Sequence, residues 1–142
     1  MNLLLVSIDS LRNDFVSRNN STIVTPRFDK VTEHFCYYPS FFSVSSATRP
    51  VHTSLFTGLY PFEHGVLGQS CARMRPGIPH LFDLFRKSNF AVGAFSEAHT
   101  VFEGLDFAPY IHPLPNKPKE SLQRLDQHLT TYRQQSSFLF IH

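Results

Sequence analysis

The feature that most constrains the fold is a run near the start of the chain that is apolar apart from Ser7. It spans residues 3–8 and ends in Asp9-Ser10. A strand with one face in water alternates apolar and polar residues, whereas a strand buried on both faces of a parallel sheet is apolar almost throughout. The run therefore predicts a strand that is buried on both faces of a parallel sheet and covered by helices on each side.

Further along the chain, strand-like and helix-like segments alternate. Apolar runs predict strands over 90–95 and 138–141, and an aromatic, irregular stretch predicts an edge strand over 36–44 that Pro39 interrupts. Helical spacing and helix-ending residues predict helices over 25–35, 50–57, 78–87 and 120–135. The proline-rich stretch 107–119 is expected to be a surface connection. This alternation predicts an α/β fold with a doubly wound, mostly parallel sheet and helices on both faces.

Two of these helices show the apolar stripe that predicts their buried face. The residues of these stripes are Leu81, Leu84 and Phe85 in the first, and Leu122, Leu125 and Leu129 in the second.

Length and composition indicate one ordinary globular domain. A chain of 142 residues can bury roughly 68% of the surface that it exposes when unfolded. A hydrophobic content of 42% with 17% charged residues argues against disorder. The net charge of +2, on scattered Lys and Arg, argues against binding to a nucleic-acid polymer. No apolar run is long enough for a signal peptide or a membrane span, so we expect a cytoplasmic chain without a membrane partner.

Cys36 and Cys71 are the two cysteines of the chain, and their spacing matches no metal site. They could form one disulfide, but we favour two reduced and partly buried thiols.

Asp9 is the first candidate site residue, because it stands at the carboxyl end of the first predicted strand. In open α/β sheets, ligands bind just beyond the carboxyl ends of the strands. A carboxylate there is poorly solvated unless a cation or a set of donors meets it. Asp9 is therefore either a ligand of a hard metal ion or an anchor of the loop that follows. His142 follows the last predicted strand and falls at the same edge of the sheet.

The segment Thr48-Arg49-Pro50-Val51-His52 is the second candidate. Pro50 predicts the first turn of a helix, whose electropositive end favours an anion such as a phosphate or sulfate ester. A hydroxyl held there and bound to a metal ion is a usable nucleophile. Read locally, Thr48 is also a common N-cap, and His52 is also a common core or surface histidine.

Five segments together resemble the sulfatase-like hydrolases of the alkaline phosphatase superfamily. They are residues 2–14, similar to the family's first strand and metal-binding turn; Thr25-Pro26-Arg27-Phe28-Asp29, similar to a helix start; residues 43–66, which end in Thr57-Gly58-Leu59-Tyr60-Pro61-Phe62-Glu63-His64-Gly65-Val66 and resemble the nucleophile segment; Gly104-Leu105-Asp106-Phe107; and the strand 138–142. The resemblance covers essentially the whole chain.

This resemblance implies an alkaline phosphatase-like fold and a site that cleaves sulfate or phosphate esters of small molecules. It implies that Thr48 is the nucleophile, that Asp9 and Thr48 bind a divalent metal ion (Ca, Mn, Mg or Zn), and that His52 positions the anion. Further candidates for the site are Ser10, Arg49, His64, His99 and His142.

Two residues depart from the sulfatase pattern. Thr48 stands where sulfatases carry the Cys or Ser that is converted to formylglycine, and Ser10 replaces the second aspartate of the metal-binding turn. The motif Thr-x-Pro-x-His instead resembles the nucleotide pyrophosphatase/phosphodiesterase branch. We therefore expect phosphodiesters or phosphonates, rather than sulfate esters, as substrates.

The ligand set of the expected metal site is incomplete within this chain. In relatives the other ligands come from a segment well downstream, and one carboxylate and one hydroxyl cannot make a hard-metal site of about four to six ligands. We expect residues 1–142 to be the N-terminal portion of a catalytic domain that has little activity without a C-terminal half. An unpaired sheet edge or apolar face should then be exposed. The alternative is a non-catalytic remnant or interaction module that pairs with a separately encoded second half.

Overall fold

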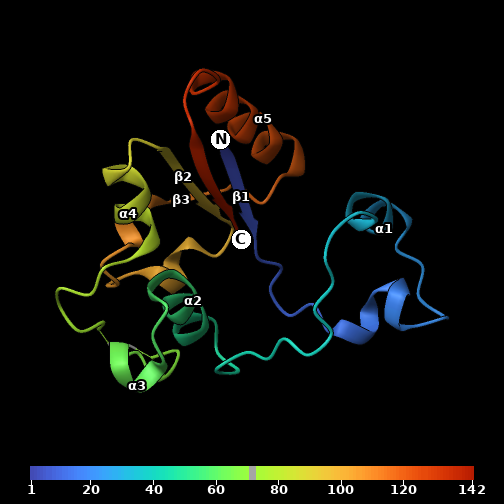
Figure 1. Cartoon of the computed structure of the whole chain (residues 1–142), viewed down its shortest axis with the longest axis horizontal. Coiled ribbons are helices and arrows are strands. Elements are labelled where there is room, and N and C mark those ends of the chain that lie inside the picture. The colour runs from blue at the N-terminus through green and yellow to red at the C-terminus, as the bar shows by residue number, and fades with distance from the viewer. Residues whose placement is uncertain (71–72) are drawn as a thin grey trace. The chain divides into compact units, whose positions relative to one another are not determined.

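The computed structural model describes residues 1–70 and 73–142. The chain divides into two compact units (Figure 1). Unit 1 contains residues 1–7 and 43–142, and unit 2 contains residues 8–42. Each unit is described by itself.

Unit 1 is built on a four-stranded sheet in which every pair of neighbouring strands is parallel. The strand order is β1-β4-β2-β3. The strands are β1 (Asn2–Val6), β2 (Ala91–Ser96), β3 (Ile111–Pro113) and β4 (Ser137–Ile141). The predicted α/β class with a parallel sheet is confirmed, and β2 and β4 lie within one residue of their predicted bounds.

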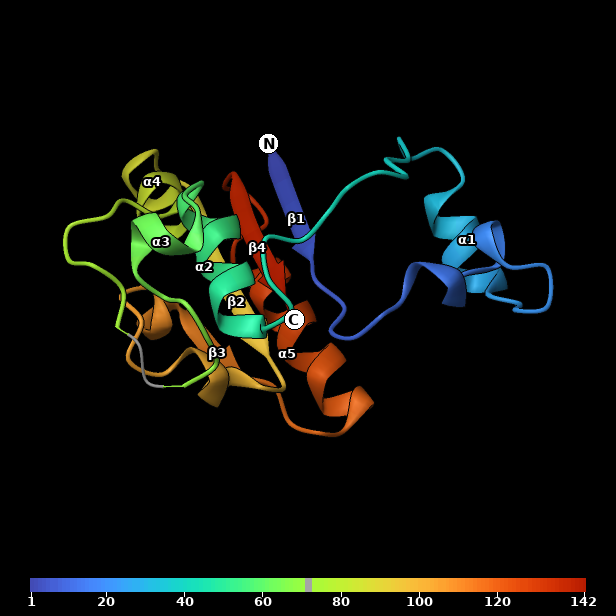
Figure 2. The same ribbon diagram turned by 90° about the horizontal axis from the view of Figure 1, so that it is seen from below.

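Helices cover both faces of this sheet (Figure 2). Helices α2 (Thr48–Thr57) and α4 (Leu81–Lys87) pack on the face that carries Phe138 and Phe140 of β4. Helix α5 (Pro118–Thr131) packs on the other face, where its Leu125 contacts the cluster around Phe95 and Leu139. The remaining elements of unit 1 are α3 (Pro61–His64), η3 (His99–Phe102) and η4 (Ala108–Tyr110).

Phenylalanine rings form most of the main core, as the phenylalanine-rich composition leads one to expect. The rings of Phe56 and Phe140 lie 4.9 Å apart between centroids, and those of Phe56 and Phe82 lie 4.7 Å apart. Their planes are steeply tilted, the arrangement that aromatic pairs favour. This cluster joins α2 and α4 to the centre of the sheet, and so fixes the helix that carries Thr48.

The prediction that the first strand is buried on both faces is wrong for this structure. β1 lies at one end of the sheet and pairs only with β4, and Leu4 and Val6 are 62% and 52% exposed. The apolar run identifies a parallel strand correctly. Burial on both faces also needs a second neighbouring strand and covering helices, which the described residues of unit 1 do not supply.

Two predictions about apolar helix faces are partly wrong. In α4 the fully buried ring is Phe82, whereas Leu84 is 50% exposed. Of the three leucines predicted to be buried in α5, Leu125 is partly buried against the sheet, and Leu122 and Leu129 are exposed. Helix α4 also begins later than predicted, because the His80 imidazole accepts a hydrogen bond from the Asp83 N–H and caps the helix there.

Two segments differ from their predicted structure. Residues 36–44 contain no strand, which we attribute to Pro39, whose missing N–H weakens any ladder at this point. The proline-rich stretch 107–119 is not only a surface connection. It contains β3 and the buried residues Phe107, Ile111 and Leu114, because a short edge strand tolerates a proline at its end.

Unit 2 is held together mainly by polar contacts. Its elements are η1 (Asn13–Phe15), η2 (Ser17–Asn19) and α1 (Pro26–Thr32). The predicted helix at Pro26 is confirmed, but the Thr25 side chain does not cap it. The Thr25 hydroxyl instead donates to the Asp29 carboxylate over 3.0 Å, and the Ser17 hydroxyl also binds Asp29. Cys36 in this unit is free and exposed rather than partly buried, and Cys71 lies outside the described residues.

Candidate active site at the carboxyl edge of the sheet

The carboxyl ends of three strands meet at one edge of the sheet, as the sequence predicted for His142. Val6 of β1 and Phe95 of β2 both pair with Ile141 of β4. The residues at this edge are therefore Ser7, Ser96 and His142. Main-chain hydrogen bonds hold them in line: Ser7 N donates to Ile141 O over 2.8 Å, and His142 N donates to Phe95 O over 2.9 Å.

Thr48 is the first residue of α2, and it is half-buried. The N-cap of α2 is Ala47, whose side chain cannot cap the helix. The Thr48 hydroxyl has no hydrogen-bond partner within residues 1–70 and 73–142, so it is not used as a cap. It lies in the helix turn whose N–H groups and dipole favour an anion. This geometry leaves the hydroxyl available for chemistry.

His52 lies one turn further along α2 and is 4% exposed. Its Nδ1 lies 2.9 Å from Thr48 O, and its Nε2 lies 2.9 Å from Ser7 Oγ. Its ring also packs against Phe102 and His142, with centroids 5.4 and 4.6 Å away. Both ring nitrogens thus contact the protein itself, so the side chain links β1 to the start of α2. Its predicted contact with an anion stays a prediction.

His142 and Ser96 form a second polar pair at the same edge. Ser96 Oγ lies 3.0 Å from His142 Nδ1, and it accepts a hydrogen bond from Ala98 N over 3.0 Å. The structure therefore brings together Thr48, His52 and His142 of the predicted residues, and adds Ser7 and Ser96. Sequence analysis did not single out these two serines, although each falls at the end of a predicted strand, which was the available signal.

Arg49 is buried, and its guanidinium binds the main chain around η3. It donates to the carbonyl oxygens of Val101 and Glu103 over 2.9 Å each. The main-chain N–H of Arg49 donates to Gln69 Oε1 over 3.1 Å. These contacts anchor the loop around η3 to α2, which accounts for the burial of this cation.

His64 is fully buried within unit 1, at a distance from the strand ends along α2. Ser54 Oγ lies 3.0 Å from His64 Nε2, and Val66 N donates to His64 Nδ1 over 3.1 Å. Burial lowers the pKa of His64, and this effect exceeds the opposing contributions of the Pro50 carbonyl and the Glu63 charge. These contacts give His64 a structural place in the turn that follows α3.

Two other histidines complete the comparison with the sequence. His99 begins η3 and is half-buried, and its role in the site stays a prediction. His80 is 4% exposed and caps α4. Desolvation lowers the pKa of His80, more than the nearby Asp83 and Asp106 raise it.

Asp9 and Ser10 belong to unit 2, whereas Thr48 belongs to unit 1. Asp9 is exposed in a turn, and Ser10 takes a left-handed conformation with φ of 57°. Such a conformation is uncommon for a residue other than glycine, and it turns the chain sharply after β1. A shared metal ion between Asp9 and Thr48 stays a prediction.

A divalent cation needs several donor side chains close together. Within residues 1–70 and 73–142, no group of three or more His, Cys, Asp or Glu side chains could hold a metal ion. The side chains that pair at the strand ends are two hydroxyls and two imidazoles. This set does not fit a resident divalent cation by itself, because hard cations need several oxygen ligands.

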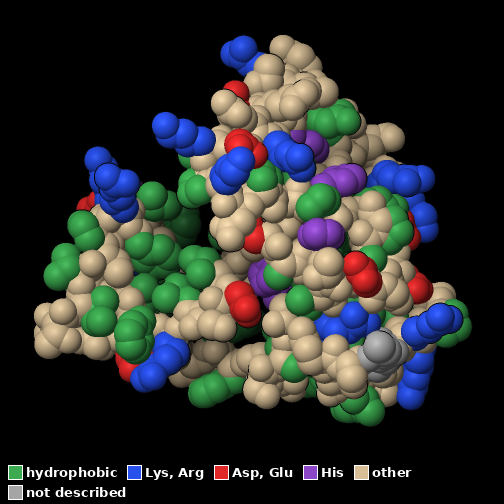
Figure 3. Space-filling view, turned by 180° about the vertical axis from the view of Figure 1, so that it is seen from behind, with side chains coloured by type: hydrophobic (Ala, Val, Ile, Leu, Met, Phe, Trp, Pro, Cys, Tyr) green, Lys and Arg blue, Asp and Glu red, His purple; other side chains and the backbone are tan. Residues whose placement is uncertain are grey.

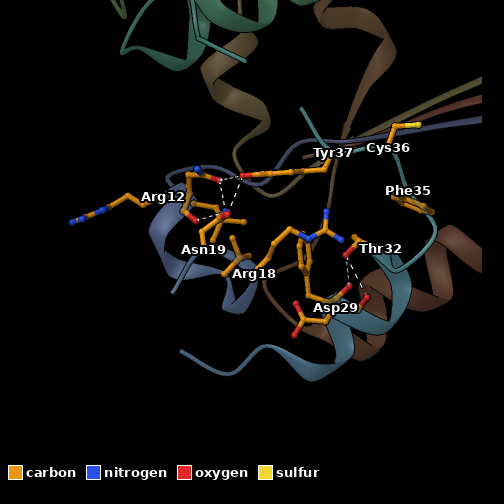
Figure 4. Close-up of a pocket in the computed structure, with 12 residues that line it drawn as sticks. Arg12, Arg18, Asn19, Asp29, Thr32, Phe35, Cys36 and Tyr37 are labelled. Atoms are coloured by element: carbon orange, nitrogen blue, oxygen red, sulfur yellow. Dashed lines mark hydrogen bonds between the residues drawn. The ribbon is translucent and has the colours of Figure 1, made fainter. Parts of the chain in front are cut away.

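Unit 2 contains a cavity of about 300 Å³ (Figure 4). The guanidinium of Arg18 lies 5.0 Å from the centre of the Tyr37 ring, and the Tyr37 hydroxyl donates to Asn19 Oδ1 over 3.0 Å. Phe35 and Cys36 complete one side of its wall. None of the predicted site residues lines this cavity.

Lys and Arg side chains are scattered over the face in Figure 3, and hydrophobic side chains are prominent on unit 2 in the same view. Within the described part of the chain, no helix is both long and apolar enough to span a membrane.

The family model described as Sulfatase matches residues 1–135 of the chain. No curated protein is similar enough to the chain to count as a match. The family match includes β1, the turn with Asp9, and α2 with Thr48 and His52. The chain therefore belongs to the sulfatase family, and its fold is that of a sulfatase-like hydrolase of the alkaline phosphatase superfamily.

Proposed function

We propose that this chain carries the nucleophile half of a metal-dependent hydrolase that cleaves phosphodiesters or phosphonates in preference to sulfate esters. Membership of the sulfatase family supports hydrolysis of esters of this kind. The observation that carries the proposal is the Thr48 hydroxyl, which begins α2 without serving as its cap. A threonine in place of a formylglycine precursor supports the preference for phosphorus over sulfur.

The proposed reaction has two steps. In the first, the Thr48 oxygen forms a bond to phosphorus or sulfur while the bond to the leaving alkoxide breaks, and the alkoxide takes up a proton. In the second, water cleaves the Thr48 ester and restores the hydroxyl. The first turn of α2 stabilises negative charge on the nonbridging oxygens through its dipole and its main-chain N–H groups.

The metal ligands are the incomplete part of this site. Asp9 is proposed as one ligand, as the resemblance implies. Because the described residues contain no three-ligand group, we propose that the other ligands come from outside residues 1–142. Turnover by residues 1–142 alone is therefore expected to be little or none.

A single-turnover experiment tests the nucleophile without requiring turnover. The chain is incubated with bis(4-nitrophenyl) phosphate and excess Mn²⁺, and peptides are examined by mass spectrometry for a phosphoryl adduct. We expect the adduct on Thr48, its loss in Thr48→Ala, and its retention in Thr57→Ala, a matched change at the other end of the helix. An unmodified Thr48 in a chain labelled elsewhere would remove the hydrolase assignment.

A steady-state assay with nitrophenyl phosphate, phosphodiester and sulfate separates the two parts of the proposal. Robust turnover that Thr48→Ala abolishes would support the nucleophile and contradict the need for further ligands. Turnover that survives Thr48→Ala would contradict both.

A second candidate function is that of an interaction module, and the open edge of β1 favours it. Met1 O and Ser7 N both bond toward β4. Main-chain groups of alternate residues along a strand point to opposite sides. The N–H and C=O groups of Leu4 and its even-numbered neighbours therefore point to the outer edge of β1, where the described residues place no strand.

The side chains beside this edge are also apolar. Leu4 and Val6 share the α5 face of the sheet, because they pair in register with Leu139 and Ile141. Leu122 and Leu129 lie on one stripe of α5, seven residues apart. This stripe lies on the side of α5 that faces away from β3.

The side of α5 nearest β3 is identified by a hydrogen bond, which runs from Arg124 to Pro113 O over 2.8 Å.

Unit 2 contains no strand that could occupy the outer edge of β1. We propose that the edge accepts an apolar, parallel strand from a separately encoded second half of the domain. The carboxyl end of such a strand would lie beside Ser7, at the edge where ligands are lacking.

Without that partner, a second copy of the chain is the probe for this edge. We expect multi-angle light scattering to show concentration-dependent association of the purified chain. Leu4→Lys should reduce the association, since it puts a charge beside the edge. The matched control is Leu55→Lys, which adds the same charge at an exposed position on α2 and should leave association unchanged. A stable monomer at high concentration would contradict the open edge.

A further inference from the structure

Two serine–histidine pairs involve α2, and they differ in which residue donates the hydrogen bond. One pair joins Ser7 to His52 at the carboxyl edge of the sheet, over 2.9 Å. The other joins Ser54 to His64 over 3.0 Å. In each pair, the partner of the second ring nitrogen determines which nitrogen carries the proton.

In the first pair the second partner is a carbonyl oxygen, which can only accept. His52 Nδ1 lies 2.9 Å from Thr48 O, so Nδ1 carries the proton and donates it. In the neutral ring Nε2 is then an acceptor, and the Ser7 hydroxyl donates to it. The neutral His52 is therefore the Nδ1–H tautomer, the less common form of a free imidazole.

In the second pair the second partner is an N–H group, which can only donate. Val66 N donates to His64 Nδ1 over 3.1 Å, so in the neutral ring Nε2 carries the proton and donates to Ser54 Oγ. This is the common tautomer of a free imidazole. Ser54 therefore binds a tautomer that the free ring already favours, whereas Ser7, together with the Thr48 carbonyl, supports one that the free ring disfavours.

The consequence for the site is a chain of two hydrogen bonds between sheet and helix. Ser7 follows β1 and holds His52, and His52 holds the main chain of Thr48. The imidazole is buried between the rings of Phe102 and Phe140, which leave it little room to move. A shift of the ring would release the Thr48 carbonyl and loosen the first turn of α2.

We propose that Ser7 is a positioning residue, which acts through the Nδ1–H tautomer of His52 to fix the main chain of Thr48 against the end of β1. The inference deepens the proposed function, and rests on it only for the catalytic role of Thr48. Small errors in the position of a reacting group reduce the rate strongly, so a residue that fixes the nucleophile contributes to catalysis without touching substrate.

The first test needs no variant and no substrate. Long-range ¹H–¹⁵N spectra of the labelled chain at neutral pH report which nitrogen of each histidine bears the proton. We expect proton-bearing Nδ1 and bare Nε2 in His52, and the reverse in His64. A His52 with the proton on Nε2 would overturn the proposal, whatever the chain does to esters.

The second test compares matched variants. Ser7→Ala should make the two nitrogen shifts of His52 converge, because the ring then samples both tautomers, and should move the ¹³C′ shift of Thr48. Ser7→Thr, which keeps the hydroxyl, should restore both signals. Ser54→Ala removes the hydroxyl of the other pair and should leave His52 and Thr48 unchanged. Unchanged His52 and Thr48 signals in a folded Ser7→Ala chain would contradict the positioning role.

The third test asks whether the hydrogen bonds from Ser7 through His52 affect the reactivity of Thr48. The rate constant for adduct formation on Thr48 is expected to fall by about tenfold in Ser7→Ala, the equivalent of about 1.4 kcal/mol for one lost hydrogen bond. Ser54→Ala should leave it unchanged, and an equal loss in both variants would contradict the proposal. A Thr48 that never forms the adduct would remove the proposed function. The tautomer measurement would still decide whether Ser7 positions Thr48 through His52.

Discussion

β1 and β4 each consist of one polar residue followed by four apolar residues, and they lie side by side, yet they differ sharply in burial. They pair in register from Asn2 with Ser137 to Val6 with Ile141. Phe140 is 0% exposed and Leu139 is 4% exposed, whereas Leu4, the partner of Leu139, is 62% exposed. β4 has a strand on each side and helices on both faces, and β1 has a single neighbour.

This difference shows that an apolar strand sequence indicates that burial would be favourable, but does not show that the folded chain buries the strand. Each buried aliphatic or aromatic side chain contributes about 1.5–3 kcal/mol when it leaves water. The side chains of β4 are buried within unit 1 and so gain this stabilisation, whereas those of β1 stay largely exposed and gain little of it. The four predictions that follow test this contrast, beginning with the largest expected effect.

The largest effect is expected for Phe140→Ala, at the centre of the aromatic core. Loss of the ring removes its contact with Phe56 and leaves a cavity between α2 and the sheet. The free energy of unfolding should fall by about 3–5 kcal/mol. Urea denaturation followed by circular dichroism measures this change. A loss below about 1 kcal/mol would mean that β4 is not the centre of the core.

A smaller loss is expected for Gly93→Ala in β2, the strand on the other side of β4. A Cβ atom at this position would lie 2.5 Å from His128 Nε2, so the ring on α5 must move. Such overpacking costs about 1–3 kcal/mol. Adding His128→Ala should relieve the clash, and the double variant should then regain stability. Failure of the second change to restore stability would exclude the ring as the cause.

Acid should loosen the β4 side of the sheet before it affects β1. The folded-state pKa of His64 is lowered by burial, so below the ordinary histidine value of about 6.5 the unfolded chain binds more protons than the folded one. The associated stability is present above that pH and is lost as the pH falls. His64 contacts Ser54 on α2, so amide exchange should rise first in α2. Equal stability at pH 7.5 and 5.5 would contradict this.

The smallest effect is expected for Leu4→Ala, the partner position to the buried Leu139. Because Leu4 is largely exposed, its truncation should change the free energy of unfolding by about 0.5 kcal/mol or less in the dilute, monomeric chain. The same urea experiment measures it beside Phe140→Ala. A loss comparable with that of Phe140→Ala would show that another part of the chain covers β1.

Much of the fold could be predicted from local patterns. The run at 138–141 predicts β4, and Gly58 marks the end of α2 because it takes φ of 74°, a left-handed conformation that glycine adopts without strain. β3 could not be predicted in the same way, because it is a three-residue strand inside a proline-rich stretch. Its pairing with β2 depends on a distant segment rather than on its own composition.

The candidate site shows the same division. The sequence located His142 at the end of a strand and Thr48 at the start of a helix, since both follow from element boundaries. It did not reveal the roles of Ser7 and Ser96, because a serine at a strand end gives no local sign of the imidazole that it will meet. The exposed Leu84 was misjudged for a related reason, since a helical stripe alone does not show which neighbouring elements will cover it.

By itself, the sequence determined that this chain is an α/β domain of the sulfatase family, because strand runs, helix-ending residues and the family match are properties of the sequence. Only the tertiary structure decided which apolar strand is central and which is open. It also decided that His52 joins Ser7 to the main chain of Thr48, because such contacts depend on how segments distant in sequence pack together.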